Sequence, residues 1–534
     1  MSDHPSFDYI IVGAGSAGAV LANRLTENGR HEVLLLEAGP EDKNPWVHVP
    51  LGYGKLFSNA ALNWLYSTTA NPEQVNRRIP QPRGKVLGGS SAINGMVYIR
   101  GDKSDYDQWR QFGNAGWSYD DVLPYFRKAE DQQRGEDEFH GVDGPLAVSD
   151  VYEEHPLVAA YLESAVAAGF KRNDDFNGAE QEGFGYVQWT IRNGRRCSTG
   201  VGYLKPARKR PNLTIATNAH ALRILIDGRR ATGIEYAQDG QTKSALAGRE
   251  VIVSGGAINS PQLLQLSGLG PAGLLSEHGI DVIADMPGVG NHLQDHINGP
   301  LMFRLKDNIS ANDVINSISQ RIRTGMQYAF TRKGFLAMGV SMGGGFYKVD
   351  PAAVAPEIQS QVMLFSSHDV GGMPHKFPGA TVVNALLRPE SRGHVNIVSP
   401  DPYTAPDIQP NYLTAQKDRD ILIGGMKIAR DIVTQAPFQA FIAEEHEPGM
   451  DCTSDADWLD YLQKRGRTSY HPSSTCRMGS NPDDVVDERL RVHGFEGLRV
   501  ADASIMPSLV SGNTNAPSIM IGEKAADLIL ADAG

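Results

Sequence analysis

Apolar runs of four or five residues recur along this chain, separated by glycine-rich turns and amphipathic stretches. Residues 9–12 and 33–36 are apolar throughout, a pattern typical of strands buried on both faces of a parallel sheet. A helix is expected between them, starting near Ser16 behind the turn at Gly13 and Gly15. Strand, glycine turn, helix and strand in this order predict an α/β unit at the start of the chain.

The glycines of this turn have the spacing of a dinucleotide-binding motif. Gly13 permits the tight turn, Gly15 lets the backbone approach a pyrophosphate, and Gly18 lets the helix pack on the sheet. Glu37 ends the second strand, where a carboxylate can bind ribose hydroxyls. A glycine-rich turn of another α/β protein is the structural alternative. The residues alone favour a dinucleotide site and do not separate FAD from NAD.

Further elements follow from the same patterning. A hairpin is expected around Asp227-Gly228, an ordered loop and helix at 83–101, and helices with a surface excursion at 101–147, which carries Trp109, Trp117, Tyr119 and Tyr125. Residues 300–465 lack a dinucleotide signature and read as a second domain on the substrate side. The remaining expected strands are 213–217, 249–254, 382–387, 394–398 and 497–502. Three further helices are expected: one that starts at Ser260-Pro261, one at 416–435 and one at 518–531.

Composition limits the class of protein. The chain has 534 residues, 41% hydrophobic and 21% charged, which predicts a globular protein of two or more domains. A net charge of −12 argues against a nucleic-acid partner. Three cysteines supply neither a disulfide framework nor the spacing of a metal site. The glycine motif begins so early that no signal peptide is expected before it, and no apolar run is long enough for a spanning helix, so a cytoplasmic enzyme is expected.

One basic segment leaves two interpretations open. Cationic residues flank apolar residues there: Arg321, Arg323, Arg332 and Lys333 lie around a set that includes Tyr328, Phe330 and Phe335. A weak peripheral membrane contact is one interpretation. A solvated helix face is the other, and it is the one favoured at this stage.

Several long segments resemble the glucose–methanol–choline (GMC) family of flavin oxidoreductases, nearest to bacterial choline-dehydrogenase-like alcohol dehydrogenases. Besides the N-terminal turn, the similarity is carried in order along nearly the whole chain by Pro82–Gly95, Gly256–Leu264, Gly288–His296, His471–Gly479, Gly497–Pro507 and Gly512–Pro517.

The resemblance implies FAD, and an α/β fold with α+β elements. A discontinuous Rossmann-like FAD-binding domain would comprise residues 1–154, 190–305 and 465–534. A substrate-binding domain with a mostly antiparallel sheet and helices would comprise 155–189 and 306–464. The residues that would hold the cofactor are Gly13, Gly15, Ser16, Ala17, Glu37, Gly88, Gly89, Ser90, Asn94, Gly95, Leu222, Asp502, Ala503 and Asn515. Gly88-Gly89 as a plain turn and Asp502 as a helix cap remain the structural alternatives.

The same resemblance assigns the catalytic positions. Alcohol oxidation removes the hydroxyl proton and transfers a hydride to flavin N5, so a base beside the flavin lowers the barrier. His471 matches the family's catalytic histidine, and its ordinary pKa suits the task. Asn513 matches the second position, where asparagine can bond the substrate oxygen but cannot act as a base. His292 and His296 are expected to be structural or near-flavin supports, and Cys476 a buried filler.

Two positions at which the sequence differs from choline-oxidising relatives limit the class of substrate. Ile93 stands where a choline-oxidising relative has a histidine bonded covalently to flavin, so non-covalent FAD is expected. Met342 aligns with an acidic residue of choline dehydrogenases. A neutral primary alcohol, aliphatic or aromatic, is therefore favoured, oxidised to the aldehyde with oxygen or a quinone as electron acceptor. An oxygen-using oxidase, a choline dehydrogenase and an FAD-containing hydroxynitrile-lyase-like enzyme remain the alternatives, and the oligomeric state stays open.

Overall fold

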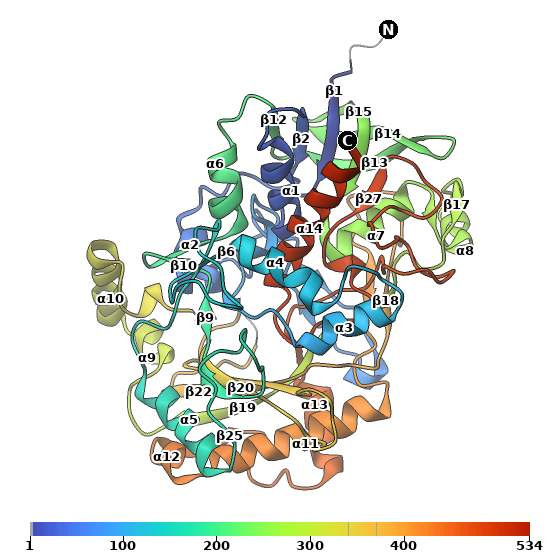
Figure 1. The fold of residues 1–534 in the computed structure, drawn as a ribbon. Coiled ribbons are helices and arrows are strands. Elements are labelled where there is room, and N and C mark those ends of the chain that lie inside the picture. Colours follow the sequence, from blue (N-terminus) through green and yellow to red (C-terminus); the bar gives the residue numbers. More distant parts are fainter. Residues whose placement is uncertain (1–3, 340, 370, 534) are drawn as a thin grey trace.

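A computed structural model describes residues 4–339, 341–369 and 371–533. The fold has two large sheets, one above the other in Figure 1, each with its own helices and its own hydrophobic core. This is the mixed α/β architecture that the sequence predicted, with a Rossmann-like layer and a mostly antiparallel layer.

The first sheet has the strand order β12-β2-β1-β15-β14-β13, with β27 paired to β15. Its centre is parallel because β1 pairs with β2 and with the second half of β15, in register Tyr9↔Val33 and Ile10↔Val251. The first half of β15 turns away into an antiparallel meander with β14 and β13. The strands are β1 (Ser6–Val12), β2 (Val33–Leu36), β12 (Leu213–Ala216), β13 (His220–Asp227), β14 (Arg230–Gln238), β15 (Gln241–Val253) and β27 (Leu498–Val500).

The predicted hairpin is present between β13 and β14, with Gly228 at positive φ in its turn. A second turn, at Asp239-Gly240, was not predicted. Both of its residues have positive φ, which suits a two-residue turn between antiparallel strands.

The helices of this layer bring the two ends of the chain together. Helix α1 (Ser16–Thr26) packs along α14 (Asn515–Ala533), and α14 also packs on α4 (Tyr119–Ala129), as Figure 1 shows. The predicted surface excursion at 101–147 is wrong for its aromatic residues. Trp109 on α3 (Lys103–Gln111), Trp117 and Tyr119 belong to the core of this layer, and the two indoles donate hydrogen bonds to backbone carbonyls.

The second sheet is antiparallel, in the order β25-β19-β22-β21-β20-β8, with β26 paired to β19. Helix α11 (Gln416–Val433) packs against β22, α5 and α13. The strands are β8 (Gly183–Tyr186), β19 (Ile297–Leu305), β20 (Ser341–Tyr347), β21 (Ile358–Met363), β22 (Gly379–Leu386), β25 (Ile442–Glu447) and β26 (Arg467–Thr468). The helices beside them are α5 (Pro156–Ala167), α9 (Ala311–Asn316), α10 (Ile318–Thr331), α12 (Ala436–Gln439) and α13 (Asp455–Arg465).

The strand pairing bears on the proposed domain limits. Strands β19 and β26 lie in the second sheet, although residues 297–305 and 467–468 fall in segments assigned from the sequence to the FAD domain. We infer that the limits lie nearer residues 296 and 469. Smaller elements complete the fold, among them α2 (Pro45–His48), α6 (Lys205–Ala207), α8 (Ala272–Glu277), the 3-10 turn η3 (Gly89–Ala92), β23 (Gly393–Asn396) and β24 (Asp407–Gln409).

Three helix starts differ from expectation. Helix α7 (Gly256–Leu266) begins four residues before Ser260, because Asp502 accepts a hydrogen bond from the Gly256 N–H and so caps the helix there. Pro261 therefore lies inside the helix, and the Ala257 carbonyl that it cannot pair accepts from the Thr475 hydroxyl instead. Helix α14 begins at Asn515, three residues early. The segment 83–101 forms only the turn η3, because Gly88 and Gly89 both have positive φ.

Candidate active site

A cavity of about 1090 Å³ lies at the carboxyl ends of the parallel strands and extends to one face of the second sheet. Ligands of α/β proteins bind at this edge of a parallel sheet. The volume exceeds the range of about 300–1,000 Å³ usual for a ligand pocket, which leaves room for a dinucleotide and a small substrate together. The site can be followed from the first sheet toward the second.

The glycine turn after β1 has the geometry that its spacing predicted. Gly13 has φ +103°, and a Cβ there would lie 2.5 Å from the Ser254 carbonyl oxygen. A Cβ on Gly18 would meet the Gly13 oxygen at 1.9 Å, so this glycine is needed for the helix to pack against the turn. Beside Gly15, in contrast, nothing lies within 4 Å of the Cβ position. The backbone there faces the open cavity and can be approached closely by a ligand.

Glu37 ends β2 inside the cavity wall. One carboxylate oxygen accepts from the Gly39 N–H at 2.8 Å and the other from the Ala14 N–H at 3.1 Å. Burial raises the pKa of this carboxyl to about 7, and the two backbone donors only partly offset that. The side chain thus fixes the glycine turn through Ala14 and also presents its remaining acceptor capacity to a ligand.

A second loop packs on the first. The Gly88 N–H donates to the Ala14 carbonyl at 2.8 Å, and a Cβ on Gly89 would lie 2.6 Å from the Gly15 Cα. Gly89, Ser90, Asn94 and Gly95 line the cavity beside this contact. Gly88 does not line it, since its role is to support the first turn from behind.

The C-terminal segment closes the same region. The Ser16 hydroxyl donates to Asn515 Oδ1 at 2.8 Å, so the first turns of α1 and α14 meet at the cavity. Helix N-termini present unpaired N–H groups and a positive dipole end, which favour phosphate. Asp502 and Ala503 line the cavity as well. The Asp502 carboxylate accepts hydrogen bonds from Gly256, Ser260 and Ser504, so it is the helix cap that the structural alternative described.

Of the sixteen residues predicted for the site, Gly88 and Leu222 are not in the cavity lining, and the other fourteen are. Next to Leu222, it is Ala219, His220 and Ala221 that reach the cavity. Ala221 and Leu222 point to opposite faces of β13 because side chains alternate along a strand, and Ala221 is on the cavity side.

A buried hydrogen-bond chain leads to the predicted base. Nε2–H of His296 donates to the Leu387 carbonyl at 3.0 Å, which leaves Nδ1 of neutral His296 as an acceptor. The Nδ1 atoms of His296 and His471 are 2.9 Å apart, so His471 is the donor of that bond. Nε2 of His471 therefore carries a lone pair, and it accepts from Asn513 Nδ2 at 3.1 Å. Gln359 completes the chain, because its amide donates to Asn513 Oδ1 at 3.1 Å.

The surroundings favour the neutral form of the His471 imidazole. Burial lowers the pKa of His471 well below its usual value, and His296 and Arg83 lower it further. Burial also lowers the pKa of His296 to about 4. A neutral imidazole with a lone pair on Nε2 can accept a proton from a hydroxyl in the cavity.

Asp295 holds the backbone of His471 in place. Its Oδ1 accepts from the His471 N–H at 2.8 Å, and its Oδ2 accepts from Thr468, Tyr412 and Gln81. Asp295 and Gln359 were not among the site residues predicted from the sequence. A signal for Asp295 was available, because it lies in the motif Gly288–His296, whereas nothing local distinguishes Gln359.

The second sheet supplies the opposite wall. Alternate residues of three strands point into the cavity, which is what a two-residue side-chain period produces. They are Asn298 and Pro300 on β19, Gln359, Gln361 and Met363 on β21, and Thr381, Val383 and Ala385 on β22. Met342 of β20 joins them. Among the described lining residues the acids are Glu37 and Asp502, both in the first layer, so this wall carries no negative charge.

The residues present fit FAD. The cradle over Gly15, the buried acceptor Glu37 and the two converging helix starts match the phosphate and ribose groups of a dinucleotide. Ile93 is buried in the cavity wall and has no atom that could bond covalently to a flavin. Cys476 is buried as well, and burial raises the pKa of its thiol, so it behaves as the predicted filler.

Comparison with known proteins agrees with this architecture. GMC oxidoreductase family models match residues 7–298 and 389–522. The chain is 43% identical to an alcohol dehydrogenase [acceptor] of Pseudomonas putida, over 98% of this chain and 96% of that one. It is 40% identical to an oxygen-dependent choline dehydrogenase of Vibrio vulnificus, over 98% and 94%. A formate oxidase structure from Aspergillus oryzae, which concerns FAD modification, superposes with a TM-score of 0.93 at 30% identity, covering 100% and 99%. The resemblance in the sequence is thereby confirmed, and the chain belongs to the GMC oxidoreductase family of FAD-dependent enzymes that act on CH–OH donors.

Proposed function

We propose that the protein oxidises a neutral primary alcohol, aliphatic or aromatic, to the aldehyde, with His471 as the base. The observation that carries this proposal is the chain from Leu387 through His296 to His471, which puts the proton on Nδ1 and the lone pair on Nε2, bonded to the cavity residue Asn513. FAD, when bound, supplies the hydride acceptor. The chain's own residues bind the alcohol, orient it and remove its proton.

Asn513 has the complementary role. Its Nδ2 bonds Nε2 of His471 directly at 3.1 Å, so an incoming alcohol replaces this bond: its hydroxyl donates to the histidine and accepts from the amide. Gln359 fixes the amide orientation, because it occupies Asn513 Oδ1. This pairing favours the alkoxide character that a hydride donor needs, since the amide N–H bonds the developing negative charge.

A neutral substrate is supported by the charges around the base. The wall from the second sheet carries no carboxylate, and Met342 contributes an apolar surface. The partly buried Arg83 also lines the cavity and affects His471 electrostatically. A quaternary ammonium group would meet this cation, and among the described lining residues it would find no acid on the second-sheet wall.

The cofactor contacts belong to the same proposal. We assign non-covalent FAD to Gly13, Gly15, Ser16, Ala17 and Glu37 for the ADP half. The flavin side is assigned to Gly89, Ser90, Asn94, Gly95, Ala503 and Asn515. Gly88 supports the turn, and Ala221 replaces Leu222 as the residue that reaches the cavity from β13.

A panel of alcohols tests the proposal. Anaerobic mixing of the holoenzyme with hexanol or benzyl alcohol should bleach the flavin with a higher kcat/KM than choline gives. Choline is the serious rival, because choline dehydrogenases are among the relatives of similar identity. A preference for choline would refute the neutral-substrate assignment, and absence of bleaching with every alcohol would refute the oxidation itself, as a lyase would behave in that way. Reoxidation by oxygen or by a quinone then identifies the electron acceptor.

A further inference from the structure

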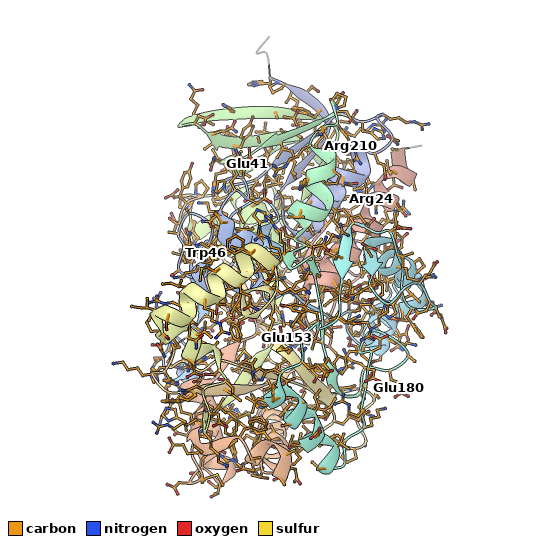
Figure 2. The ribbon with its side chains drawn as sticks, turned by 90° about the vertical axis from the view of Figure 1, so that its left-hand side faces the viewer. Arg24, Glu41, Trp46, Glu153, Glu180 and Arg210 are labelled. Atoms are coloured by element: carbon orange, nitrogen blue, oxygen red, sulfur yellow. The ribbon has the colours of Figure 1, made fainter. Side chains whose placement is uncertain are left out.

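Helix α10 carries an apolar stripe on its exposed side. Ile318, Ile322, Met326 and Phe330 follow each other at intervals of four, and their exposed fractions are 68, 57, 53 and 87%. Residues four apart lie on one face of a helix, so the four side chains form one continuous surface. Figure 1 shows α10 standing out at one side of the molecule, and Figure 2 presents that side to the viewer.

The helix rests on the protein through its other face. Thr324 and Tyr328 are its buried residues, and the Tyr328 hydroxyl donates to the Gly194 carbonyl at 3.0 Å. At about 100° per residue these two positions lie roughly opposite the centre of the stripe. The stripe is therefore not the face through which α10 packs on the rest of the protein. Of the aromatic residues singled out in the sequence, only Phe330 belongs to it, since Tyr328 is buried and Phe335 is a partly buried cavity residue.

The charge of this segment is opposite to that of the chain. Residues 314–333 contain four cationic residues and no acidic residue, in a protein of net charge −12. Arg321 and Arg323 flank the stripe on its two sides, and Arg332 and Lys333 follow the helix end. All four are exposed, and none of them has an ion-pair partner in the described part of the chain.

The same helix forms part of the active-site wall. Arg321, Thr324 and Gly325 line the cavity from α10. Other cavity residues are themselves apolar and open to the outside, notably Met373, which is 78% exposed, and Trp46, which is 41% exposed. The exposed stripe and the cavity thus share one rim.

We propose that α10 attaches the protein to an anionic membrane surface, with its apolar stripe in the interface and the cavity rim facing the lipid. An apolar face bordered by arginine and lysine is the pattern of a helix lying in a lipid headgroup region. A second copy of this chain fits less well, because a symmetric contact would bring the cations of two helices together. No helix in the described ranges combines the length and apolarity that crossing a bilayer requires, so the attachment is peripheral.

The consequence for function rests on the proposed alcohol oxidation. Medium-chain alcohols partition into lipid, as does a quinone acceptor. A cavity that opens at the interface receives both from the membrane without transfer through water.

Vesicle flotation of the holoenzyme tests the attachment. The protein should float with vesicles of phosphatidylcholine and phosphatidylglycerol and bind pure phosphatidylcholine much more weakly. The double variant Ile322→Ser/Phe330→Ser removes two stripe residues that do not line the cavity, and it should lower binding by about tenfold or more. Arg323→Gln/Lys333→Gln should lower binding by ~5-fold for each cation, on anionic vesicles only. Val354→Ser is the matched control, because Val354 is also 87% exposed, in the loop between β20 and β21, and it should leave binding unchanged.

Turnover with a soluble dye separates this inference from the function. The stripe variant should oxidise hexanol with dye at the wild-type rate, while its reduction of a quinone embedded in vesicles should fall together with binding. Equal flotation of the wild type and the stripe variant would overturn the attachment and leave the proposed function intact. The attachment would also be overturned if the wild type were a dimer in vesicle-free solution and the stripe variant a monomer, since the stripe would then bind a second copy of the chain.

Discussion

The hydrogen-bond chain behind His471 makes a prediction that two substitutions at one buried position can separate. His296 makes two bonds, one to the Leu387 carbonyl through Nε2 and one to Nδ1–H of His471 through Nδ1. Asparagine places its amide oxygen near the position of Nδ1, so His296→Asn keeps the acceptor for His471 and loses the bond to Leu387. Glutamine reaches as far as Nε2, so His296→Gln keeps the bond to Leu387 and loses the acceptor for His471.

The expected magnitude follows from one hydrogen bond. Each variant loses one buried bond, so both should be destabilised by about 1–3 kcal/mol. Only His296→Gln removes the acceptor of Nδ1–H of His471. The preference for the tautomer with its proton on Nδ1 and its lone pair on Nε2 then falls by about 1–1.5 kcal/mol. The rate of flavin reduction should therefore fall by about five- to tenfold in His296→Gln relative to His296→Asn.

Anaerobic stopped-flow reduction at saturating hexanol measures this difference, with FAD content and the midpoint of thermal unfolding recorded for both variants. Similar unfolding midpoints with unequal reduction rates are the predicted outcome. Equal reduction rates would refute the reasoning, since His296 would then support the fold without controlling the protonation of His471.

The remaining predictions concern the base, the ribose acceptor and the attachment of the cofactor. Because burial lowers the pKa of His471 well below its usual value, His471 should be neutral at pH 7, so the reduction rate should stay level from pH 9 to about 6.5 and fall only in more acidic solution. A decline centred above pH 7 in the stopped-flow pH profile would contradict this. Glu37→Ala should weaken FAD binding by about 1.5–3 kcal/mol for the lost charged hydrogen bond, and by more because Ala14 and Gly39 also lose their acceptor. Glu37→Gln should weaken FAD binding less. Fluorescence titration of the apoprotein with FAD measures both dissociation constants, and unchanged values would remove Glu37 from the site. Acid precipitation should leave the yellow flavin in the supernatant, because Ile93 offers no linking atom, and colour retained in the washed pellet would contradict non-covalent binding.

Local patterns predicted the parts of the fold that are set by local physics. The apolar runs at 9–12 and 33–36 form central parallel strands, and the spacing of Gly13, Gly15 and Gly18 predicted the turn between them. The errors arose where a distant residue decides the outcome. Helix α7 begins early because Asp502, far along the chain, caps it, and a local reading of Pro261 as a helix start could not foresee that.

The same limit applies to the site. The histidine segment was recognised through its resemblance to a family, but the partners that set its chemistry come from other elements. His296 precedes β19, Gln359 lies on β21 and Asn513 precedes α14, so the packing of the second sheet against the first layer brings them to His471. The stripe on α10 was overlooked for a different reason. The sequence interpretation singled out Tyr328, Phe330 and Phe335, of which only Phe330 belongs to the stripe. The four-residue spacing of Ile318, Ile322 and Met326 is the informative pattern.

The central claim is that Nε2 of His471 accepts the hydroxyl proton of an alcohol. Single-turnover flavin reduction by a saturating alcohol, compared between wild type, His471→Ala and Asn513→Ala, tests it most directly. His471→Ala should reduce its flavin about 10²–10⁴-fold more slowly than wild type at normal FAD content, the usual contribution of a positioned base. Asn513→Ala should lose less, because it removes a bond to the substrate oxygen and leaves the base in place. Reduction of His471→Ala at the wild-type rate, with FAD bound normally, would contradict the claim.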